Sequence, residues 1–562
     1  MKKKWEYIET NENKINEICR EFDIDRLLAS ILVNREITNI EDIRVFLEPT
    51  RNDFHNPYLM PDMDIAVKRI IKAIDNKEKI MIYGDYDVDG ITSITVLKKF
   101  LIERGIEVRS YVPNRLDEGY GLNMQAIEKI AKEDFKLMIT VDCGISGIEE
   151  VENAKALGIE TIITDHHEPL DELPNALAVI DAKRKDSKYP FNQLAGVGVV
   201  FKLIQAIGQA LKLDDTHYLK YLDLVCVGTI SDIVPLVNEN RVIAKLGLKL
   251  VKVTKNLGLK KLIQSAGITQ IDSSAISFGV APRINACGRM GHEQDALELF
   301  LSEDENTVNM LTQKLNEYNK IRQETEKKIV EEALEEIEKN KENEKNAIIV
   351  GKSGWHHGVI GIVASKITDM YFKPSILLSF EEVIAKGSGR SIPGFDLHEA
   401  LCKCSSYLEK YGGHGMAVGL NLKKENLEQF KLKFEEYAKD SDLTKIQPIL
   451  NIDSVITSKE INLDTINSLK KLEPYGEGNK MPIFVYKGLK INSIRALTEG
   501  KHLKLTLKDE NLTLNAIGFN MGNLVDEYLI GDRVDIAGVL ETNTFNGITS
   551  IQINLKDIMK SV

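Results

Sequence analysis

The chain has 562 residues, of which 43% are hydrophobic and 28% are charged. This composition is ordinary for a globular protein and excludes wholesale disorder, and the length suggests about three or four domains. The 85 acidic and 73 basic side chains give a net charge of −12, which by itself does not favour nucleic-acid binding.

Three features bear on location. No run approaches the roughly 18 uninterrupted apolar residues of a membrane span. The basic residues 2–4 are followed by polar residues rather than by the apolar core of a signal peptide. The six cysteines lack the spacing of a zinc or disulfide framework. We therefore expect a cytoplasmic protein with reduced thiols and no membrane contact.

The first half of the chain changes pattern near residue 60. Residues 1–60 indicate a lead-in of small helices and loops, and strands then alternate with helices. Strands are predicted at 79–83, 108–112, 137–141 and 159–164, and helices at 91–104 and 147–157. Such alternation indicates an α/β domain, residues 61–303, with a parallel sheet covered on both faces.

Residues 304–346 are rich in Glu, Lys, Asn and Gln and contain neither Gly nor Pro. Their apolar residues recur at a helical period, which predicts one long connecting helix or two in tandem. An unbroken helix of this length would reach about 60 Å. It would be either a solvated spacer or a wall beside a substrate channel.

The remaining chain divides into two parts. Residues 347–445 indicate a second α/β domain, which contains several glycine motifs. Residues 446–562 are mostly β, with one short helix near 523–528. The predicted strands are 483–495, 502–508, 512–519, 533–540 and 548–555. Short strands with turn signals suggest a small β-barrel.

Three carboxylates, Asp85, Asp87 and Asp89, follow the first predicted strand. Their alternation resembles a calcium loop, but Val96 stands where that loop needs a bidentate glutamate. A calcium loop also lies between two helices, whereas this run follows a strand. A polar turn that caps the next helix remains the simpler alternative.

Two further strands end in the same way. Asp142 follows the strand at 137–141, and Asp165, His166 and His167 follow the strand at 159–164. In an open parallel sheet, ligands gather beyond the carboxyl ends of the strands. Because clustered carboxylates repel one another unless a cation is present, a metal site is favoured over separate helix caps.

Asp232, at the end of the apolar segment 222–230, is either a helix cap or a further carboxylate of this site. Many oxygens with imidazole and no thiolate point to manganese or magnesium. The number of ligands suggests two ions about 4 Å apart, which suits hydrolysis of a phosphate ester.

These motifs resemble the DHH phosphoesterase family, named for the Asp-His-His found here at 165–167. Similar segments are 31–35, 46–49, 113–116, 118–122, 282–289, 355–361 and 412–419. The resemblance covers nearly the whole chain and is to the bacterial exonucleases specific for single-stranded DNA. It implies a metal-dependent 5′-to-3′ exonuclease of DNA repair and recombination, with an OB-fold as the barrel. Single-stranded DNA is the expected partner of a monomer, with a helicase and a single-strand-binding protein as further candidates.

The resemblance also implies roles. Asp87, Asp89, Asp142, His166 and Asp232 would be metal ligands, and Asp142 would bridge two ions. Asp165 would orient an imidazole and His167 would contact the scissile phosphate, so that Asp165, His166 and His167 form the catalytic set. Many family members carry His where this chain has Tyr83. Either Asp85 or water would supply that ligand.

Glycine-rich runs and basic residues are candidates for phosphate binding, because glycine lets backbone amides approach and arginine binds phosphate bidentately. The candidates are Arg115, Arg283, Asn285, Arg289, His356, Ser388, Arg390, Gly413 and His414. A glycine run can equally be a tight turn. The residues of 283–289 are either a salt-bridge set at a helix edge or clamps on the substrate backbone.

The predicted barrel carries a basic stripe. Between Lys480 and Lys508 there are seven basic residues and a single acidic one, Glu499. With Phe484 and Tyr486 nearby, this stripe suits a strand of nucleic acid, although it can also be a solvated basic face. The candidates for binding are Lys487, Lys490, Arg495, Lys501 and Lys504.

Two other functions fit the resemblance. The chain could be a DHH phosphoesterase acting on short oligonucleotides, cyclic dinucleotides or polyphosphate, or a DNA-binding subunit on an inactive nuclease scaffold. The barrel and the connector 304–346 favour the exonuclease over the first. The metal-ligand set, retained apart from Tyr83, argues against the second.

Overall fold

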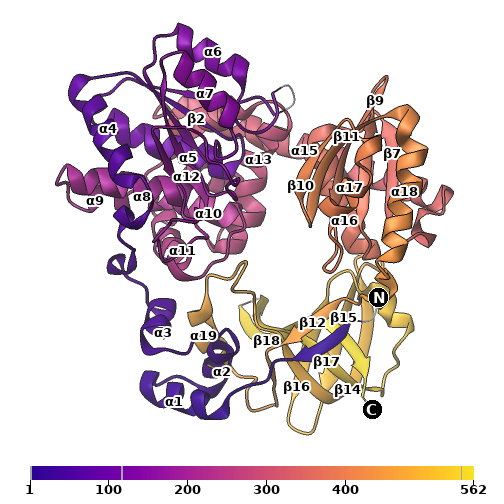
Figure 1. The fold of residues 1–562 in the computed structure, drawn as a ribbon. Coiled ribbons are helices and arrows are strands. Elements are labelled where there is room, and N and C mark those ends of the chain that lie inside the picture. Colours follow the sequence, from indigo (N-terminus) through magenta and orange to yellow (C-terminus); the bar gives the residue numbers. More distant parts are fainter. Residues whose placement is uncertain (1–2, 116–117, 546, 562) are drawn as a thin grey trace. The chain divides into compact units, whose positions relative to one another are not determined.

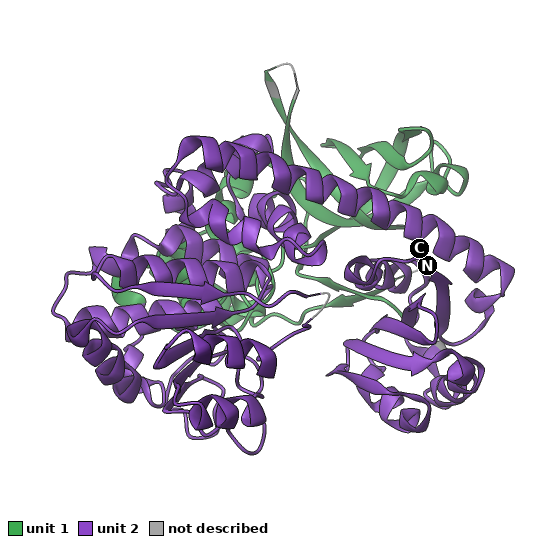
Figure 2. Cartoon of the chain, turned by 90° about the horizontal axis from the view of Figure 1, so that it is seen from above, with its two compact units in different colours: residues 1–53, 235–245, 447–562 green, residues 54–234, 246–446 purple. Residues whose placement is uncertain are grey.

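The computed structural model describes residues 3–115, 118–545 and 547–561. The chain divides into two compact units (Figure 2). Unit 1 comprises residues 1–53, 235–245 and 447–562, and unit 2 comprises residues 54–234 and 246–446.

Unit 2 begins with a sheet of five parallel strands in the order β3-β2-β4-β5-β6. Helices surround this sheet near the label β2 (Figure 1). The strands are β2 (Ile80–Gly84), β3 (Val108–Tyr111), β4 (Leu137–Val141), β5 (Glu160–Thr164) and β6 (Ala178–Ile180). The accompanying helices are α4 (Met63–Asn76), α5 (Val88–Ile102), α6 (Met124–Lys132), α7 (Ile148–Ala156) and α8 (Gly196–Ala210). Every residue of β2 and β4 is buried, as expected for a parallel sheet covered on both faces. The predicted α/β fold is confirmed, and β6 is an additional strand.

A helical region follows the sheet. It contains α9 (Thr216–Leu219), α10 (Leu222–Ser231), α11 (Asn238–Val251), α12 (Leu257–Ser265), the π-helical turn η3 (Ala275–Val280), α13 (Ala281–Arg289) and α14 (Glu293–Leu301).

The predicted connector is one unbroken helix, α15 (Glu305–Lys339), of 35 residues. Its length is therefore about 52 Å. Asp304 caps it by accepting a hydrogen bond from the amide of Thr307. The helix packs on α12, α13 and α14 and then on α16 (His357–Tyr371) and β7 (Ile348–Ser353), across both parts of unit 2 (Figure 2). Because one face is buried along this length, the helix is not a solvated spacer.

The second part of unit 2 is a mixed sheet in the order β10-β11-β9-β8-β7. Its remaining strands are β8 (Ser375–Phe380), β9 (Ile384–Arg390), β10 (Lys410–His414) and β11 (Ala417–Lys423), and its other helices are α17 (Leu397–Lys403) and α18 (Leu427–Asp440). Only β7 and β8 pair in parallel.

Unit 1 is built around the barrel. Its strands are β13 (Ser454–Val455), β14 (Phe484–Leu497), β15 (His502–Lys508), β16 (Thr513–Gly518), β17 (Arg533–Phe545) and β18 (Ile548–Lys560). The order is β13-β14-β15-β16-β18-β17, and pairing of β14 with β17 closes the barrel. The sequence predicts the start of each long strand within two residues. The helix predicted near 523–528 is a short 3-10 turn, Gly522–Asp526.

The N-terminal residues share the core of the barrel. Helices α1 (Glu12–Phe22), α2 (Arg26–Asn34) and α3 (Ile40–Leu47) contribute Ile15, Leu28 and Ile43, which pack in one cluster with Leu489 and Leu505. A strand absent from the prediction, β1 (Lys4–Tyr7), pairs in parallel with β12 (Ile449–Ile452). Every helix within the described residues is too short or too polar to cross a bilayer.

Candidate metal centre and phosphate pocket

The carboxyl ends of β2, β4 and β5 bring the predicted metal ligands together. Among the described residues, three sets of side chains have donor atoms within 4.8 Å of one another. The sets are Asp85, Asp87 and Asp142; Asp89, His166 and Asp232; and Asp142, His166 and His167. Asp142 belongs to two of them, so it occupies the position expected of a bridging ligand.

The first turn of α8 positions Asp89. The carboxylate accepts hydrogen bonds from the amides of Gly196, at 2.6 Å, and Val197, at 2.8 Å. These amides are free because they begin a helix, where anions are stabilised. A Cβ atom at Gly196 would lie 2.6 Å from Oδ1 of Asp142, so only glycine permits this approach.

Asp142 and His166 are the central pair. Asp142 has a φ of 60°, and its amide donates to the carbonyl of Thr164 at 3.0 Å. Nε2 of His166 lies 3.2 Å from Oδ1 of Asp142, 3.7 Å from Oδ2 of Asp232 and 3.9 Å from Oδ2 of Asp89. The imidazole therefore faces three carboxylates that come from separate segments of the chain.

Asp232 follows the last residue of α10, where the helix presents free carbonyl groups. Asp232 is the C-cap residue of α10, because its amide donates to the carbonyl of Gly228 at 2.9 Å. Its carboxylate cannot satisfy carbonyls, so the side chain is left for the metal site and the two interpretations are compatible. The next residue, Ile233, has a φ of 63°, which is rare for a β-branched side chain. Backbone strain of this kind is typical of functional sites.

Four buried atoms at this site have no hydrogen-bond partner among the described residues: Oδ1 of Asp85, Oδ1 of Asp142, Nε2 of His166 and Oδ2 of Asp232. Burial, and then the charges of neighbouring aspartates, raise the pKa values of the three carboxyl groups. Burial also lowers the pKa of His166 to about 3, so its imidazole is neutral. Unpaired carboxylate oxygens and a neutral imidazole are metal donors, and this oxygen-rich set without thiolate fits manganese or magnesium.

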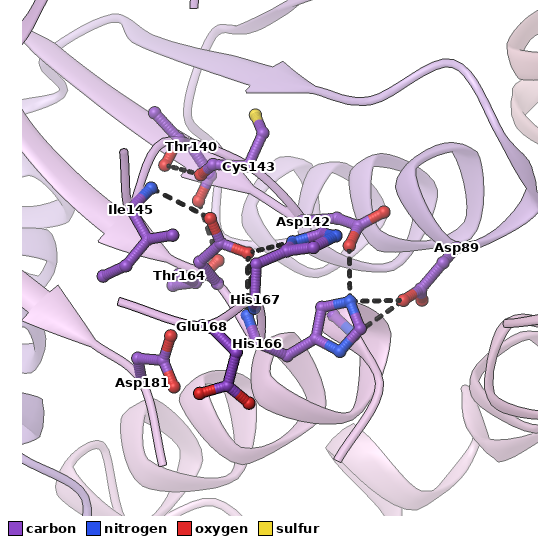
Figure 3. A network of polar contacts seen from close by, with 12 residues as sticks. Asp89, Thr140, Asp142, Cys143, Ile145, Thr164, His166, His167, Glu168 and Asp181 are labelled. Carbon is purple, nitrogen blue, oxygen red and sulfur yellow. Dashed lines mark hydrogen bonds and ion pairs between the residues drawn. The ribbon is translucent and has the colours of Figure 1, made fainter. Parts of the chain in front are cut away.

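In the polar network that surrounds His166 and His167 (Figure 3), Asp165 has a different role from these two neighbours. Its Oδ1 accepts the amide of His166 at 2.7 Å and lies 2.7 Å from Nδ1 of His167, and its Oδ2 accepts the amide of Ile145 at 2.9 Å. Burial alone would raise the pKa of Asp165, but the hydrogen bond and charge of His167 hold it below its usual range. Asp165 therefore fixes His167 instead of joining the metal donors.

Tyr83 turns away from the centre. Its hydroxyl donates to the carbonyl of Gly121 at 3.1 Å, and its ring stacks on Tyr111. Asp85 lies among the metal donors. Asp87 caps α5 by accepting the amide of Gly90 at 3.1 Å and also lies among the donors, so the cap and the metal interpretations of this motif are compatible.

Arginines gather beside the N-terminus of α16. Burial, and then the charges of Arg115, Arg322 and Arg390, lower the pKa of Arg289 to about 10. Arg289 donates to the carbonyl of Gly358 at 3.0 Å, and Arg390 donates to the carbonyl of Gly389 at 2.7 Å. Converging cations at a helix N-terminus form a binding place for an anion such as phosphate.

The pocket at these arginines has a volume of about 530 Å³. Its lining includes Arg115, His357, Gly358, Lys386 and Gly412. Ser388 accepts a hydrogen bond from Arg390 at 3.2 Å, and His356 caps α16 through Nδ1. Leu116, part of the motif that supplies Arg115, lies outside the described residues.

Comparison with known proteins fits these features. Family models match residues 79–229 (DHH family, N-terminal domain), 343–440 (DHHA1 domain) and 452–557 (RecJ OB domain). The single-stranded-DNA-specific exonuclease RecJ of Bacillus subtilis is 40% identical, over 99% of this chain and 71% of its own length. The chain belongs to the RecJ family.

Other RecJ proteins support this assignment. RecJ of Haemophilus influenzae is 33% identical, over 94% of this chain and 95% of its own length. The crystal structure of Thermus thermophilus RecJ in complex with Mn²⁺ matches 100% of this chain and 80% of that chain, with a TM-score of 0.87 and 29% identity. A second structure of that protein contains Mg²⁺.

The other phosphate candidates in this RecJ-family chain are more dispersed. Arg283 donates to Oδ1 of Asn316 at 2.7 Å and to the carbonyl of Gly279 at 2.6 Å, so two of its groups are already used. Asn285 accepts the amide of Val88 at 3.3 Å and so reaches the first metal motif.

Gly413 and His414 lie in the exposed strand β10. Gly413 has a φ of 131°, and a Cβ atom there would lie 2.3 Å from the carbonyl oxygen of Ala417, so this strand position beside the turn at 415–416 requires glycine. His414 pairs with Ala417, which itself pairs with Arg390. The substrate roles of both residues stay predictions.

The basic stripe of the RecJ OB domain lies on the outer surface of the barrel. Arg495 pairs with Lys504 and Lys490 with Lys508, on β14 and β15. Directly opposed like charges are destabilising, and none of these four residues has an acidic ion-pair partner within the described part of the chain. Lys487 lies near the ring of Tyr7, and Lys501 is exposed just before β15. These opposed charges favour binding of an anion at this surface.

The aromatic part of the barrel prediction is wrong. Phe484 and Tyr486 are 0% and 6% exposed and belong to the core of unit 1, so neither offers a free ring face. Phe519, which is 51% exposed and stands edge-on to His502, presents an aromatic ring at the surface. The first three residues of β14, 484–486, are all buried, because core clusters cover both faces of the strand there, and proximity to lysines in the sequence does not reveal this.

Several other contributors were missed from sequence. The amides of Gly196 and Val197 hold Asp89, and the hydroxyl of Tyr120 lies 3.1 Å from Nδ1 of His167. Arg322, on α15, joins the arginines. Tyr120 stands between two glycines, a pattern from which the sequence could have identified it as a candidate site residue. Nothing distinguishes Arg322 among the many charged residues of its helix.

Proposed function

We propose that this chain is a metal-dependent exonuclease that hydrolyses phosphodiester bonds of single-stranded DNA from the 5′ end. The observation that carries the proposal is the convergence of buried, unpaired carboxylate and imidazole atoms at the strand ends of a RecJ-family chain. The arginine pocket in the same unit supports it, since it offers a place for a terminal phosphate.

The donor sets suggest two ions. One would be held by Asp85, Asp87 and Asp142, and the other by Asp89, His166 and Asp232, with Asp142 shared. Bound ions would make water a better nucleophile and neutralise the charge that develops on the phosphate. The buried amides of Gly196 and Val197 keep Asp89 in place for this task.

Asp165 and His167 act on the phosphate. The hydrogen bond from Nδ1 of His167 to Asp165 fixes the orientation of the ring. Burial would lower the pKa of His167, but Asp165 raises it above its usual value, which favours the protonated ring. A protonated His167 can donate from Nε2 to an oxygen of the scissile phosphate.

The arginine pocket would set the direction of digestion. A terminal 5′ phosphate carries more negative charge than an internal diester, so converging guanidinium groups prefer it. Arg115, Arg289 and Arg390, with Ser388 and His356 beside them, would hold that end. The bond next to the bound end is then presented for cleavage.

The OB domain would bind the DNA strand at a surface separate from the residues that carry out hydrolysis. Its exposed, like-charged pairs suit the phosphates of single-stranded DNA, which the name of the Bacillus subtilis relative gives as its substrate. A cytoplasmic monomer that acts in repair and recombination, with a helicase and a single-strand-binding protein as partners, is the cellular setting that we propose. The domain division 1–60, 61–303, 304–346, 347–445 and 446–562 belongs to the same proposal.

A panel of 5′-phosphorylated strands tests this function. Strands of about 2, 20 and 40 nucleotides, single or annealed, would be incubated with Mn²⁺ and with the Asp142→Asn variant as control. The proposal expects the long single strands to be digested to mononucleotides, the duplex to resist and the variant to be inactive. Digestion of dinucleotides alone would indicate an oligonucleotide phosphoesterase, and binding without cleavage would indicate an inactive scaffold.

A further inference from the structure

One helix carries a continuous outward stripe past the candidate site. The π-helical turn η3 continues without a break into α13. Its inward face consists of Ile276, Val280, Ile284 and Cys287, all 0% exposed. On the opposite side, at spacings of four, three and four residues, stand Phe278, Pro282, Asn285 and Arg289. This spacing places side chains on one side of a helix.

Two members of the stripe already belong to the candidate site. Arg289 lies beside the arginine pocket, where it donates to the carbonyl of the lining residue Gly358, and Asn285 accepts the amide of Val88, which lies between Asp87 and Asp89. The stripe therefore runs from the pocket, past the metal centre, to Phe278. Seven residues separate Asn285 from Phe278, a distance of about 10 Å along the helix.

Phe278 presents a free aromatic face at the far end of this stripe. Its side chain is 80% exposed, and it pairs with no aromatic ring or cation in the described part of the chain. A single exposed phenylalanine is common on protein surfaces, so exposure alone carries no conclusion. Its alignment with Asn285 and Arg289 is what sets it apart.

The backbone holds Phe278 in this position. The carbonyl of the next residue, Gly279, accepts a hydrogen bond from Nη1 of Arg283 at 2.6 Å. A Cβ atom at Gly279 would lie 2.7 Å from Cδ1 of Ile268, so the close approach of the two segments requires glycine. π-Helical turns are rare and occur frequently at functional sites. The ring is thus presented by a turn with defined contacts.

We propose that Phe278 stacks on a base of the DNA strand on the 3′ side of the scissile bond, beyond the first two nucleotides. This inference rests on the proposed function, which places the 5′ end in the arginine pocket and so directs the remaining strand along the stripe toward Phe278. Stacking on an aromatic ring tolerates every base, as an exonuclease requires. It also selects single strands, because paired bases stack on their neighbours and leave no free face.

Length-dependent kinetics test this contact. kcat/KM for release of the first nucleotide would be measured on a 5′-phosphorylated dinucleotide and a 20-mer, with Phe278→Ala, Phe278→Leu and Phe278→Trp. We expect Ala and Leu to lower kcat/KM on the 20-mer about tenfold, the effect of a stacking contact of about 1.4 kcal/mol. Trp should restore it, and the loss on the dinucleotide should be much smaller. Leu432→Ala, at a residue that is 69% exposed on α18, is the matched control.

A strand with one abasic sugar locates the stacked base. Moving the abasic position along the 20-mer should reveal one site at which the wild-type protein and Phe278→Ala become alike. Equal losses on dinucleotide and 20-mer, or restoration by Leu as well as Trp, would overturn the stacking role. If the wild-type protein digests the 20-mer and Phe278→Ala behaves like Leu432→Ala, this inference alone fails. If the wild-type protein does not digest it, the proposed function fails and this inference with it.

Discussion

Nε2 of His166 lies 3.2 Å from Oδ1 of Asp142, and neither atom has another hydrogen-bond partner among the residues described. The imidazole is neutral, because burial depresses its pKa, and the carboxyl group is buried beside other aspartates. Both atoms can therefore bind a metal ion, because no hydrogen bond within the described residues occupies them. A cation shared by these atoms accounts for the arrangement with the fewest assumptions.

The first prediction compares two aspartates of the same helix region. Asp232→Asn should abolish the rise in melting temperature that Mn²⁺ causes, because it removes a donor of the proposed site. Asp223→Asn should keep that rise, since the carboxylate of Asp223, on α10, accepts a hydrogen bond from the hydroxyl of Thr254 and is not a donor of the proposed metal site. Thermal unfolding with and without Mn²⁺ measures both. Loss of the metal effect in both variants would show a general folding defect instead.

The second prediction concerns pH. Burial, and then the charge of Asp87, raise the pKa of Asp89 to about 7. Because the folded form holds its proton more tightly than the unfolded form, the stability of the metal-free protein should fall as pH rises from about 4 through about 7. Mn²⁺ binding releases protons, so its stabilising effect should grow over the same interval. Melting temperatures between pH 5 and 8 test this, with Asp89→Asn expected to flatten the metal-free curve. A metal-free melting temperature that rises across this interval is the contrary result.

The third prediction concerns the 5′ end. Arg390→Gln should reduce kcat/KM on 5′-phosphorylated strands. The loss of transition-state stabilisation should be about 1.5–3 kcal/mol, the range expected when a hydrogen bond to a charged group is removed. The effect should be much smaller on 5′-hydroxyl strands. Arg109→Gln, which changes an exposed arginine on β3, serves as control. An equal loss on both substrates would mean that Arg390 holds the backbone generally or supports the fold.

The fourth prediction concerns the barrel. Removing a single cation that binds a DNA phosphate should reduce the slope of log affinity against log salt by about 0.7. Arg495→Gln and Lys504→Gln, at two opposed strand positions, should each do so, whereas Lys459→Gln, in an exposed turn of the same unit, should not. Point changes are preferable to deletion of the barrel, because residues 1–53 share its core. Unchanged slopes would identify the stripe as a solvated face.

The sequence predicted which side chains converge at the candidate metal centre, because strand ends are visible in it. Asp142 and the segment 165–167 directly follow apolar runs, and the ends of parallel strands meet at one edge of a sheet. The same argument could not assign Asp165, because its partners are backbone amides set by the loop conformation. It also could not show that Tyr83 points into the core.

The sequence pattern could not predict which strands distant in the chain pair with each other. The pairing of β1 with β12 joins residues more than 400 positions apart, and nothing in either short segment identifies the other. Phe484 and Tyr486 were assigned to a binding surface by their proximity in sequence to lysines, but β14 is buried on both faces at its start, which places them inside. Phe278 was not singled out, since only the helix register relates it to Asn285.

A single digestion experiment tests the central claim most directly. A 5′-phosphorylated 40-mer would carry a label on either its first or its last nucleotide, and products would be followed in Mn²⁺ with the wild-type protein and Asp142→Asn. The account predicts that the wild-type protein releases the first nucleotide at the earliest times as a mononucleotide. The last nucleotide should stay in progressively shorter strands, and the variant should do neither. Release of the last nucleotide first, internal cuts, or equal activity of the variant would contradict it.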